Sequence, residues 1–425
     1  MRVEEVLKKK LSEIKVSGNE EQVILKHANA FLLDLNKNLK RLEAKAVLGG
    51  SFSKGTAVKK KYYDVDIFVR FPRKSKNISE LLQSVLKKMK LKFSRLPGSR
   101  DYFSINVKED GAKFKIELVP VVLIKKPKEA LNVTDVSPLH VSYVKSKTKK
   151  NKKLADEIRL AKAFCFAQDC YGAESYIKGF SGYCLEVLTI YYGSFVKFVR
   201  GAVKWDKMKK LVIDPAKHYP KNAKVVFKEL NEAKLMSPLV LIDPVQKDRN
   251  ASAALSYEKF YKLSKVCKSF LKRPSLSYFE KKEIDEEKLA KEAKKKKYGL
   301  FRIDTFSNKL KEDISGAKLL KLHGLMELQL KKEGYVFKSL FEFDEKYGKH
   351  YFIITKKPKE FIQQGPPVKL KQHAVEFKKR WKKYSIKSGR LIAKRKVRSV
   401  QEMLKIDDKR LQDMGINSFK ISEWA

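Results

Sequence analysis

The chain has 425 residues, of which 43% are hydrophobic and 11% aromatic, and this composition excludes wholesale disorder. Its length predicts about two to four domains. A formal net charge of +47 predicts a polyanionic partner, because Lys and Arg that neutralise phosphates release counterions. No stretch reaches the roughly 18 consecutive apolar residues of a membrane span, so we expect nucleic acid and no membrane.

The N-terminus and the cysteines predict a soluble protein of a reducing, cytoplasmic compartment. Residues 1–16 are typical of a charged amphipathic helix and lack the apolar region of a secretory signal. Cys165 and Cys170 do not have the Cys-x-x-Cys spacing of a structural zinc site. We expect these two thiols, together with Cys184 and Cys267, to be reduced and buried.

Apolar periodicity predicts an α/β segment with a mixed sheet over the first 125 residues. Residues 1–45 are typical of two helices, and the loop GGSFSKGT then leads into the strand YDVDIFVRF. A third helix is expected to begin after Ser79 as its N-cap. The segments DYFSINV and KFKIELVPVVLI flank a Gly-containing turn, which predicts a β-hairpin.

The rest of the chain is predicted to be mainly helical and then α+β. Between about residues 136 and 270 the pattern is helical, with Ser181 as the cap of one helix. A Lys-rich solvated helix or linker, a small α+β module, a GPP breaker, a basic helix and a last helical segment follow. We therefore expect three domains, at residues 1–135, 136–270 and 271–425, of which the middle one is mainly helical.

Two carboxylates lie inside the apolar strand YDVDIFVRF. Side chains alternate along a strand, so Asp64 and Asp66 share one face while the residues between them enter the core. Glu117, on the hairpin strand, is expected to approach both if the two strands are neighbours. Acids this close repel unless a cation lies between them, and Mg²⁺ prefers oxygen ligands. These three residues therefore predict a two-metal site for phosphoryl or nucleotidyl transfer.

The small-residue turn before the strand predicts the phosphate side of the same site. Gly49 and Gly50 permit close approach of the backbone, and Ser51 is expected to cap a following helix that faces anionic oxygens. Lys54, one turn on, can balance a triphosphate. The Walker A pattern of the other large class of phosphate-binding loops is absent.

The Gly-Gly-Ser turn followed after about a dozen residues by Asp-x-Asp resembles the polymerase β-type nucleotidyltransferase superfamily. Further stretches are similar to the archaeal, class I CCA-adding enzyme family, and they follow in the family's order: LNVTDVSPLHVSYV, RLAKAFCFAQDCYGAESYIKGFSGYCLEVLTIYYGSF, LIDPVQKDRNASAALS and QGPPVKLKQHAVEFKKRW. The resemblance covers essentially the whole chain. It implies a polymerase β-like head, a helical middle domain and α+β C-terminal RNA-binding modules.

The resemblance also implies the reaction and its residues. The reaction is addition or repair of the 3′-terminal CCA of tRNA from CTP and ATP without a nucleic-acid template, with two Mg²⁺ ions at Asp64, Asp66 and Glu117. Nucleotide contacts are implied for Gly50, Ser51, Lys54, His140, Lys162, Tyr171, Arg249 and Asn250. In the family Arg is usual at the position of Lys54 and Asp at that of Glu117. The oligomeric state stays open, a homodimer included.

Other interpretations stay open at this point. A poly(A) polymerase-like RNA terminal transferase shares the head motif but adds many adenosines. An RNA-binding protein with a degenerate head is the alternative outside enzymes, although all three carboxylates are present. For single residues, His140 can fill a loop, Lys162 can lie on a solvated helical face, and Tyr171 can be a packed aromatic.

Overall fold

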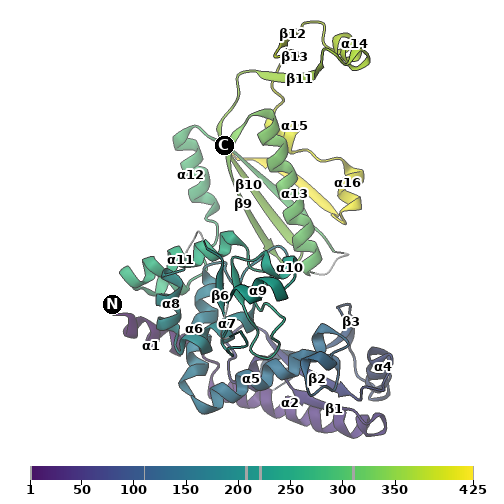
Figure 1. Ribbon diagram of the computed structural model, residues 1–425, viewed down its shortest axis with the longest axis vertical. Coiled ribbons are helices and arrows are strands. Elements are labelled where there is room, and N and C mark those ends of the chain that lie inside the picture. The colour runs from purple at the N-terminus through teal and green to yellow at the C-terminus, as the bar shows by residue number, and fades with distance from the viewer. Residues whose placement is uncertain (1, 110, 206–208, 220–222, 309–311, 425) are drawn as a thin grey trace. The chain divides into compact units, whose positions relative to one another are not determined.

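The chain forms two compact units, Met1–Lys282 and Glu283–Ala425 (Figure 1). The computed structural model describes residues 2–109, 111–205, 209–219, 223–308 and 312–424. The α+β class is confirmed, with a sheet and a helical part in the first unit and two sheets in the second. The predicted borders after residues 135 and 270 stay predictions. Within the described residues no helix is long and apolar enough to cross a membrane.

A five-stranded mixed sheet begins the first unit, in the order β1-β2-β5-β4-β3. Strands β2 and β5 run parallel and the other neighbours antiparallel, as predicted for a mixed sheet with a β4–β5 hairpin. One face of β2 is buried at Val65, Ile67 and Val69. The strands are β1 (Lys45–Leu48), β2 (Tyr63–Phe71), β3 (Ser94–Leu96), β4 (Tyr102–Glu109) and β5 (Ala112–Val122).

Helices α2 (Gly18–Leu39) and α4 (Ile78–Lys88) belong to the same hydrophobic core as this sheet. Their apolar faces enter it because buried residues recur at helical spacing, for example Leu82 and Leu86 in α4. The predicted cap of α4 was wrong. The helix begins at Ile78 after Asn77, and the hydroxyl of Ser79 donates to the carbonyl of Asp101 instead.

The remainder of the first unit is mainly helical, as predicted, around a core of aromatic rings and four buried free cysteines. Ser181 caps α7 as predicted, since its hydroxyl oxygen accepts from the amide of Cys184 at 3.1 Å. Two short strands pair in parallel in this part. The elements are α1 (Val3–Ile14), α5 (Ser137–Lys150), α6 (Lys153–Ala167), α7 (Gly182–Tyr192), α8 (Phe195–Val203), β6 (Leu211–Ile213), α9 (Ala223–Glu229), α10 (Glu232–Leu235), β7 (Leu239–Leu241) and α11 (Tyr257–Lys272).

The second unit contains a four-stranded antiparallel sheet, β14-β8-β10-β9, packed on a long helix, and a three-stranded sheet, β11-β13-β12. The Lys-rich helix and the α+β module agree with the sequence prediction, whereas the last segment was wrong in part, because β14 ends it as a strand paired with β8. The elements are α12 (Glu286–Lys296), β8 (Gly299–Phe306), α13 (Glu312–Glu333), β9 (Val336–Asp344), β10 (Tyr347–Lys356), β11 (Phe361–Pro367), α14 (Lys371–Arg380), β12 (Ser385–Lys387), β13 (Arg390–Arg395), α15 (Val400–Leu404), α16 (Asp408–Asp413) and β14 (Ser418–Glu423).

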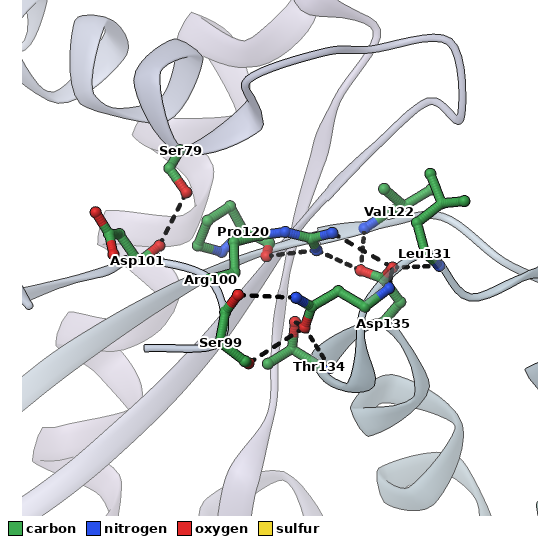
Figure 2. A network of polar contacts seen from close by, with 10 residues as sticks. Ser79, Ser99, Arg100, Asp101, Pro120, Val122, Leu131, Thr134 and Asp135 are labelled. Atoms are coloured by element: carbon green, nitrogen blue, oxygen red, sulfur yellow. Dashed lines mark hydrogen bonds and ion pairs between the residues drawn. The ribbon is translucent and has the colours of Figure 1, made fainter. Parts of the chain in front are cut away.

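A buried carboxylate fastens the segment that leaves the five-stranded sheet (Figure 2). Asp135 is fully buried and pairs with the guanidinium of Arg100. Its oxygens also accept from the backbone amides of Val122, Leu131 and Asn132 at 2.8, 3.0 and 2.9 Å. One side chain therefore satisfies donors from the end of β5 and from the turn before α5.

Replacing Asp135 with Ala should lower the free energy of unfolding of the first unit by about 3–5 kcal/mol, because a partly buried guanidinium and three backbone amides lose the carboxylate that accepts their hydrogen bonds. Chemical denaturation, with hydrogen exchange of the β5 amides as a readout of this unit, measures the loss. The control is Glu13→Ala, which removes an exposed carboxylate that pairs with Lys10 and should cost less than about 1 kcal/mol. Equal losses in the two variants would contradict this account.

Candidate functional site

The register between β2 and β5 brings the three predicted carboxylates together. Asp66 lies directly opposite Glu117 in the parallel pair, and Asp64 lies opposite Lys115. The ammonium of Lys115 is 3.8 Å from Asp64 and 3.9 Å from Glu117. Three acids thus gather on the face of β2 that is turned away from the core, with a lysine beside them.

Burial and mutual repulsion raise the pKa of two of these acids. Burial raises the pKa of Asp66 to about 6, with Lys54 opposing the shift and Asp64 adding to it. Burial likewise raises the pKa of Glu117 to about 7, and the charges of Asp64 and Asp66 add to that shift. This electrostatic environment favours a further cation beside the carboxylates.

The donor set suits a hard divalent cation, since it consists of carboxylate oxygens on adjacent strands. As the side chains stand, however, no group of three or more His, Cys, Asp or Glu in the described part of the chain has the geometry of a metal site. Lys115 lies within ion-pair distance of Asp64 and Glu117, so it would have to move aside for a cation between them.

The turn at Gly49 and Gly50, which follows β1, approaches Asp66 of β2 so closely that only glycine fits at position 50. The amide of Gly49 donates to the carbonyl of Asp66 at 2.7 Å. Gly50 has φ +58°, and a Cβ on it would lie 1.7 Å from Oδ2 of Asp66. The predicted capping role of Ser51 was wrong, because α3 (Gly50–Lys54) has Gly49 as its N-cap and Ser51 lies inside the helix.

Lys54 and Lys162 converge on one buried acid, Glu186 of α7. The ammonium of Lys54 and that of Lys162 each lie 2.8 Å from its carboxylate. Thr56 donates to the same carboxylate at 3.2 Å and accepts from Lys162 at 3.2 Å. Lys162 is only 8% exposed, so the interpretation of it as part of a solvated helical face is wrong.

Tyr171 lies next to this cluster, with its hydroxyl near Lys162. A Cβ on Gly182 would lie 3.0 Å from the Tyr171 hydroxyl and 4.0 Å from Cε of Lys162, so these three residues are neighbours. Burial raises the pKa of Tyr171 to about 12, with the charge of Glu186 adding to the shift. The hydroxyl therefore stays protonated and able to donate a hydrogen bond.

A second cluster joins His140 and Arg249 through Asp243. Nε2 of His140 lies 2.8 Å from the carboxylate of Asp243, and Arg249 donates to it at 2.6 Å. The hydroxyl of Tyr183 donates to the same acid at 2.9 Å, and its ring stacks on His140 with centroids 4.2 Å apart. Burial alone would raise the pKa of Asp243, but His140, the backbone amide of Val245 and Arg249 hold it at about 2.

Asn250 is the predicted nucleotide contact that the structure does not bring to either cluster. It is 4% exposed, and its amide oxygen accepts from the backbone of Leu241 and Ser252 at 3.0 and 2.9 Å. Its nitrogen donates to the carbonyl of Lys234 at 2.8 Å. These bonds shape the loop that carries Arg249.

The chain is similar to several archaeal proteins along much of its length. It is 36% identical over 323 residues to the CCA-adding enzyme of Nanoarchaeum equitans, which is 75% of this chain and 76% of that protein. It is 31% identical over 408 residues to the CCA-adding enzyme of Methanocaldococcus jannaschii, covering 92% and 87% of the two chains. The chain belongs to the CCA-adding enzyme family. It is therefore an enzyme, a nucleotidyltransferase.

Two family descriptions match the two parts of the first unit. Residues 156–280 match the family described as tRNA nucleotidyltransferase, second domain. Residues 1–157 match the Second Messenger Oligonucleotide or Dinucleotide Synthetase domain. The resemblance to the archaeal CCA-adding enzyme family that the sequence indicated is thus confirmed.

Solved structures confirm the polymerase β-like fold. A cytoplasmic RNA terminal U-transferase superposes with a TM-score of 0.51 at 18% identity, covering 66% of this chain and all of that chain. The Cid1 poly(U) polymerase gives the same TM-score at 16% identity and covers 65% and 98% of the two chains. At these identities the likeness concerns the fold.

Sequence reasoning missed Glu186, Asp243 and Tyr183, which join the predicted residues to one another. The sequence carried one signal, because Glu186 is the lone acid of the apolar helix segment CLEVLTIYY. A buried acid in such a helix needs a cationic partner. Which cation supplies it depends on contacts over more than 100 residues, as between Lys54 and Glu186.

Gly50→Ala should remove nucleotide incorporation, because its Cβ would meet Asp66 Oδ2 and displace that carboxylate. Gly55→Ala is a matched control, since Gly55 also has positive φ, at +66°, but open space at its Cβ. Both variants carry backbone strain, so thermal unfolding should shift similarly in the two. A steady-state incorporation assay should show at least a tenfold larger loss for Gly50→Ala; equal losses would contradict the close-approach argument.

Proposed function

We propose that this chain adds or repairs the 3′-terminal CCA of tRNA by sequential nucleotidyl transfer from CTP and ATP, without a nucleic-acid template and with release of pyrophosphate. Membership of the CCA-adding enzyme family supports the substrates. The observation that carries the chemistry is the parallel register that sets Glu117 opposite Asp66, beside Asp64.

Asp64, Asp66 and Glu117 would hold Mg²⁺, with two ions expected. A bound metal would supply Lewis acidity, which would lower the pKa of the attacking hydroxyl and offset charge on the leaving group. The chain's own part is to keep three carboxylates on one sheet face, with Gly50 pressed against Asp66. That arrangement would position the tRNA 3′-hydroxyl for attack on the α-phosphorus.

Lys54 and Lys162 would bind the triphosphate. Both ammonium groups lie on one buried carboxylate, and Lys54 is close enough to lower the pKa of Asp66 against the effect of burial. The nucleotide phosphates would therefore lie between acids that hold the metal and lysines that offset the charge of departing pyrophosphate. Backbone at Gly50, the Ser51 hydroxyl and the Tyr171 hydroxyl would supply further donors.

His140 and Arg249 would face the nucleotide base. Asp243 contacts both, and the Tyr183 ring stacks on His140 and lies 5.7 Å from the Arg249 guanidinium. This arrangement fixes two donor-bearing side chains at one place. Specificity for C and then A would depend on the shape that these side chains and the RNA end form together.

The second unit would bind the acceptor arm of tRNA through phosphate and 2′-hydroxyl contacts. A groove of about 760 Å³ between β11, β13 and α14 is lined by aromatic and basic side chains, among them Phe377, Trp381, Arg380 and Arg398. Stacking and phosphate contacts of this kind favour RNA. A cytoplasmic location and a homodimer stay predictions.

An RNA terminal transferase that adds many identical nucleotides is the second candidate function, favoured by the fold likeness to RNA terminal U-transferases. The two activities differ in their product. Transfer of C, C and A ends after three nucleotides, whereas a tailing enzyme continues on one nucleotide.

The test is incubation of tRNA lacking CCA with labelled CTP and ATP, followed by sequencing of the product. We expect C, C and A and no longer tail. Asp64→Ala or Asp66→Ala should each lower the rate by roughly 10³-fold or more while tRNA binding is kept, because metal ligands stabilise the transition state. The control is Asp101→Ala, an acid that lies directly before β4 and pairs with Arg95. Homopolymer tails, or normal turnover by either variant, would overturn the proposal.

A further inference from the structure

Glu186 is a buried acid to which the proposed reaction assigns no role. It lies in the middle of α7, and its side chain is fully buried among apolar helix residues. A carboxylate in such surroundings is costly unless cations and hydrogen-bond donors surround it. Its partners are Lys54, Lys162 and Thr56, which come from two segments more than 100 residues apart.

The two lysines are nearly as buried as the acid that they share. Their side chains are 12% and 10% exposed, so each ammonium is held in place instead of moving in solvent. Lys162 gives one hydrogen bond to Glu186 and one to Thr56, which leaves a third N–H donor. Two ammonium groups and one carboxylate carry a net charge of +1, which suits a polyphosphate.

We propose that Glu186 is a positioning residue of the nucleotide site, whose carboxylate holds the ammonium groups of Lys54 and Lys162 side by side for the triphosphate. The inference rests on the proposed function for the identity of the nucleotide, but the cluster itself requires only a polyphosphate. Glu186 touches neither substrate nor metal in this account and acts through the two lysines.

Without Glu186 the cluster cannot keep both charges. Lys54 and Lys60 are the cations that act on Lys162, Tyr171 is a neutral phenol, and Glu186 is the acid that faces it among the described groups. Removing that acid leaves buried ammonium groups that repel, and burial favours the neutral amine. Burial already lowers the pKa of Lys162, and without Glu186 that pKa would fall further, so the site would lose a phosphate contact as pH rises.

The test is Glu186→Gln, with tripolyphosphate as the probe in isothermal titration calorimetry between pH 7 and 9. The dissociation constant of the variant, taken relative to that of the unaltered protein at the same pH, should rise about tenfold over this range, and KM for CTP should rise with it more than kcat falls. Adding Lys162→Gln to the variant should abolish the pH dependence, because the titrating group is then gone.

Two further variants distinguish the effect of the carboxylate's position on binding from a general loss of folding stability. Glu186→Asp keeps the charge but is one methylene shorter, so binding should weaken severalfold without pH dependence; it also serves if Glu186→Gln does not fold. Asp135→Asn is the matched control, an equally buried, Arg-paired acid near Val122, about 16 Å along β5 from Glu117, and it should leave tripolyphosphate binding unchanged.

The outcomes distinguish the inference from the proposed function. If the unaltered protein adds CCA, and both Glu186 variants bind tripolyphosphate with the same affinity and pH profile as the unaltered protein, only the inference about Glu186 is overturned. If the unaltered protein adds no CCA but Glu186→Gln shows the pH-dependent loss, the positioning role stands and the tRNA reaction falls.

Discussion

The ion-paired cluster around Glu186 is the interaction on which the proposed nucleotide site depends most. It ties the end of α3, through Lys54, and the turn that follows it, through Thr56, to the helices α6 and α7. The sheet carries the acids and the helices carry most of the other predicted nucleotide contacts. A single buried carboxylate therefore holds together two parts of the chain that must act on one nucleotide.

Helix α7 extends this role along its first turns. Gly182 leaves room for the Tyr171 hydroxyl beside Lys162, Tyr183 stacks on His140, and Glu186 binds the lysines. Residues three and four apart lie on one helix face, so the three contacts follow from helical geometry. The expected phosphate contacts and the expected base contacts are consequently aligned by one rigid element.

The sequence predicted those features of the site that depend on local periodicity. Alternation along β2 placed Asp64 and Asp66 on one face, and the hairpin pattern brought in Glu117. The cap assigned to Ser51 failed because the helix begins at Gly50, which contacts Asp66, and this is two residues earlier than a serine cap at position 51 would require. Likewise β14 was missed, since its exposed pattern becomes a strand only by pairing with β8.

Long-range electrostatics could not be predicted in this way. Nothing near Lys162 in the sequence shows that it faces Glu186, and nothing near His140 indicates Asp243, about 100 residues on. Family resemblance selected Lys162 and His140, but it gave no physical reason for their orientation. The structure supplies that reason as two buried carboxylates: Glu186 lies between two lysines, and Asp243 lies between His140 and Arg249.

The central claim is that one nucleotide joins the acids of β2 and β5 to the lysines around Glu186. A crystal structure with CTP and Mn²⁺ tests it most directly. The account predicts anomalous density beside Asp64, Asp66 and Glu117, with the β- and γ-phosphates on Lys54 and Lys162 and Lys115 turned away from the acids. Metal bound elsewhere, or phosphates that contact neither Lys54 nor Lys162, would contradict it.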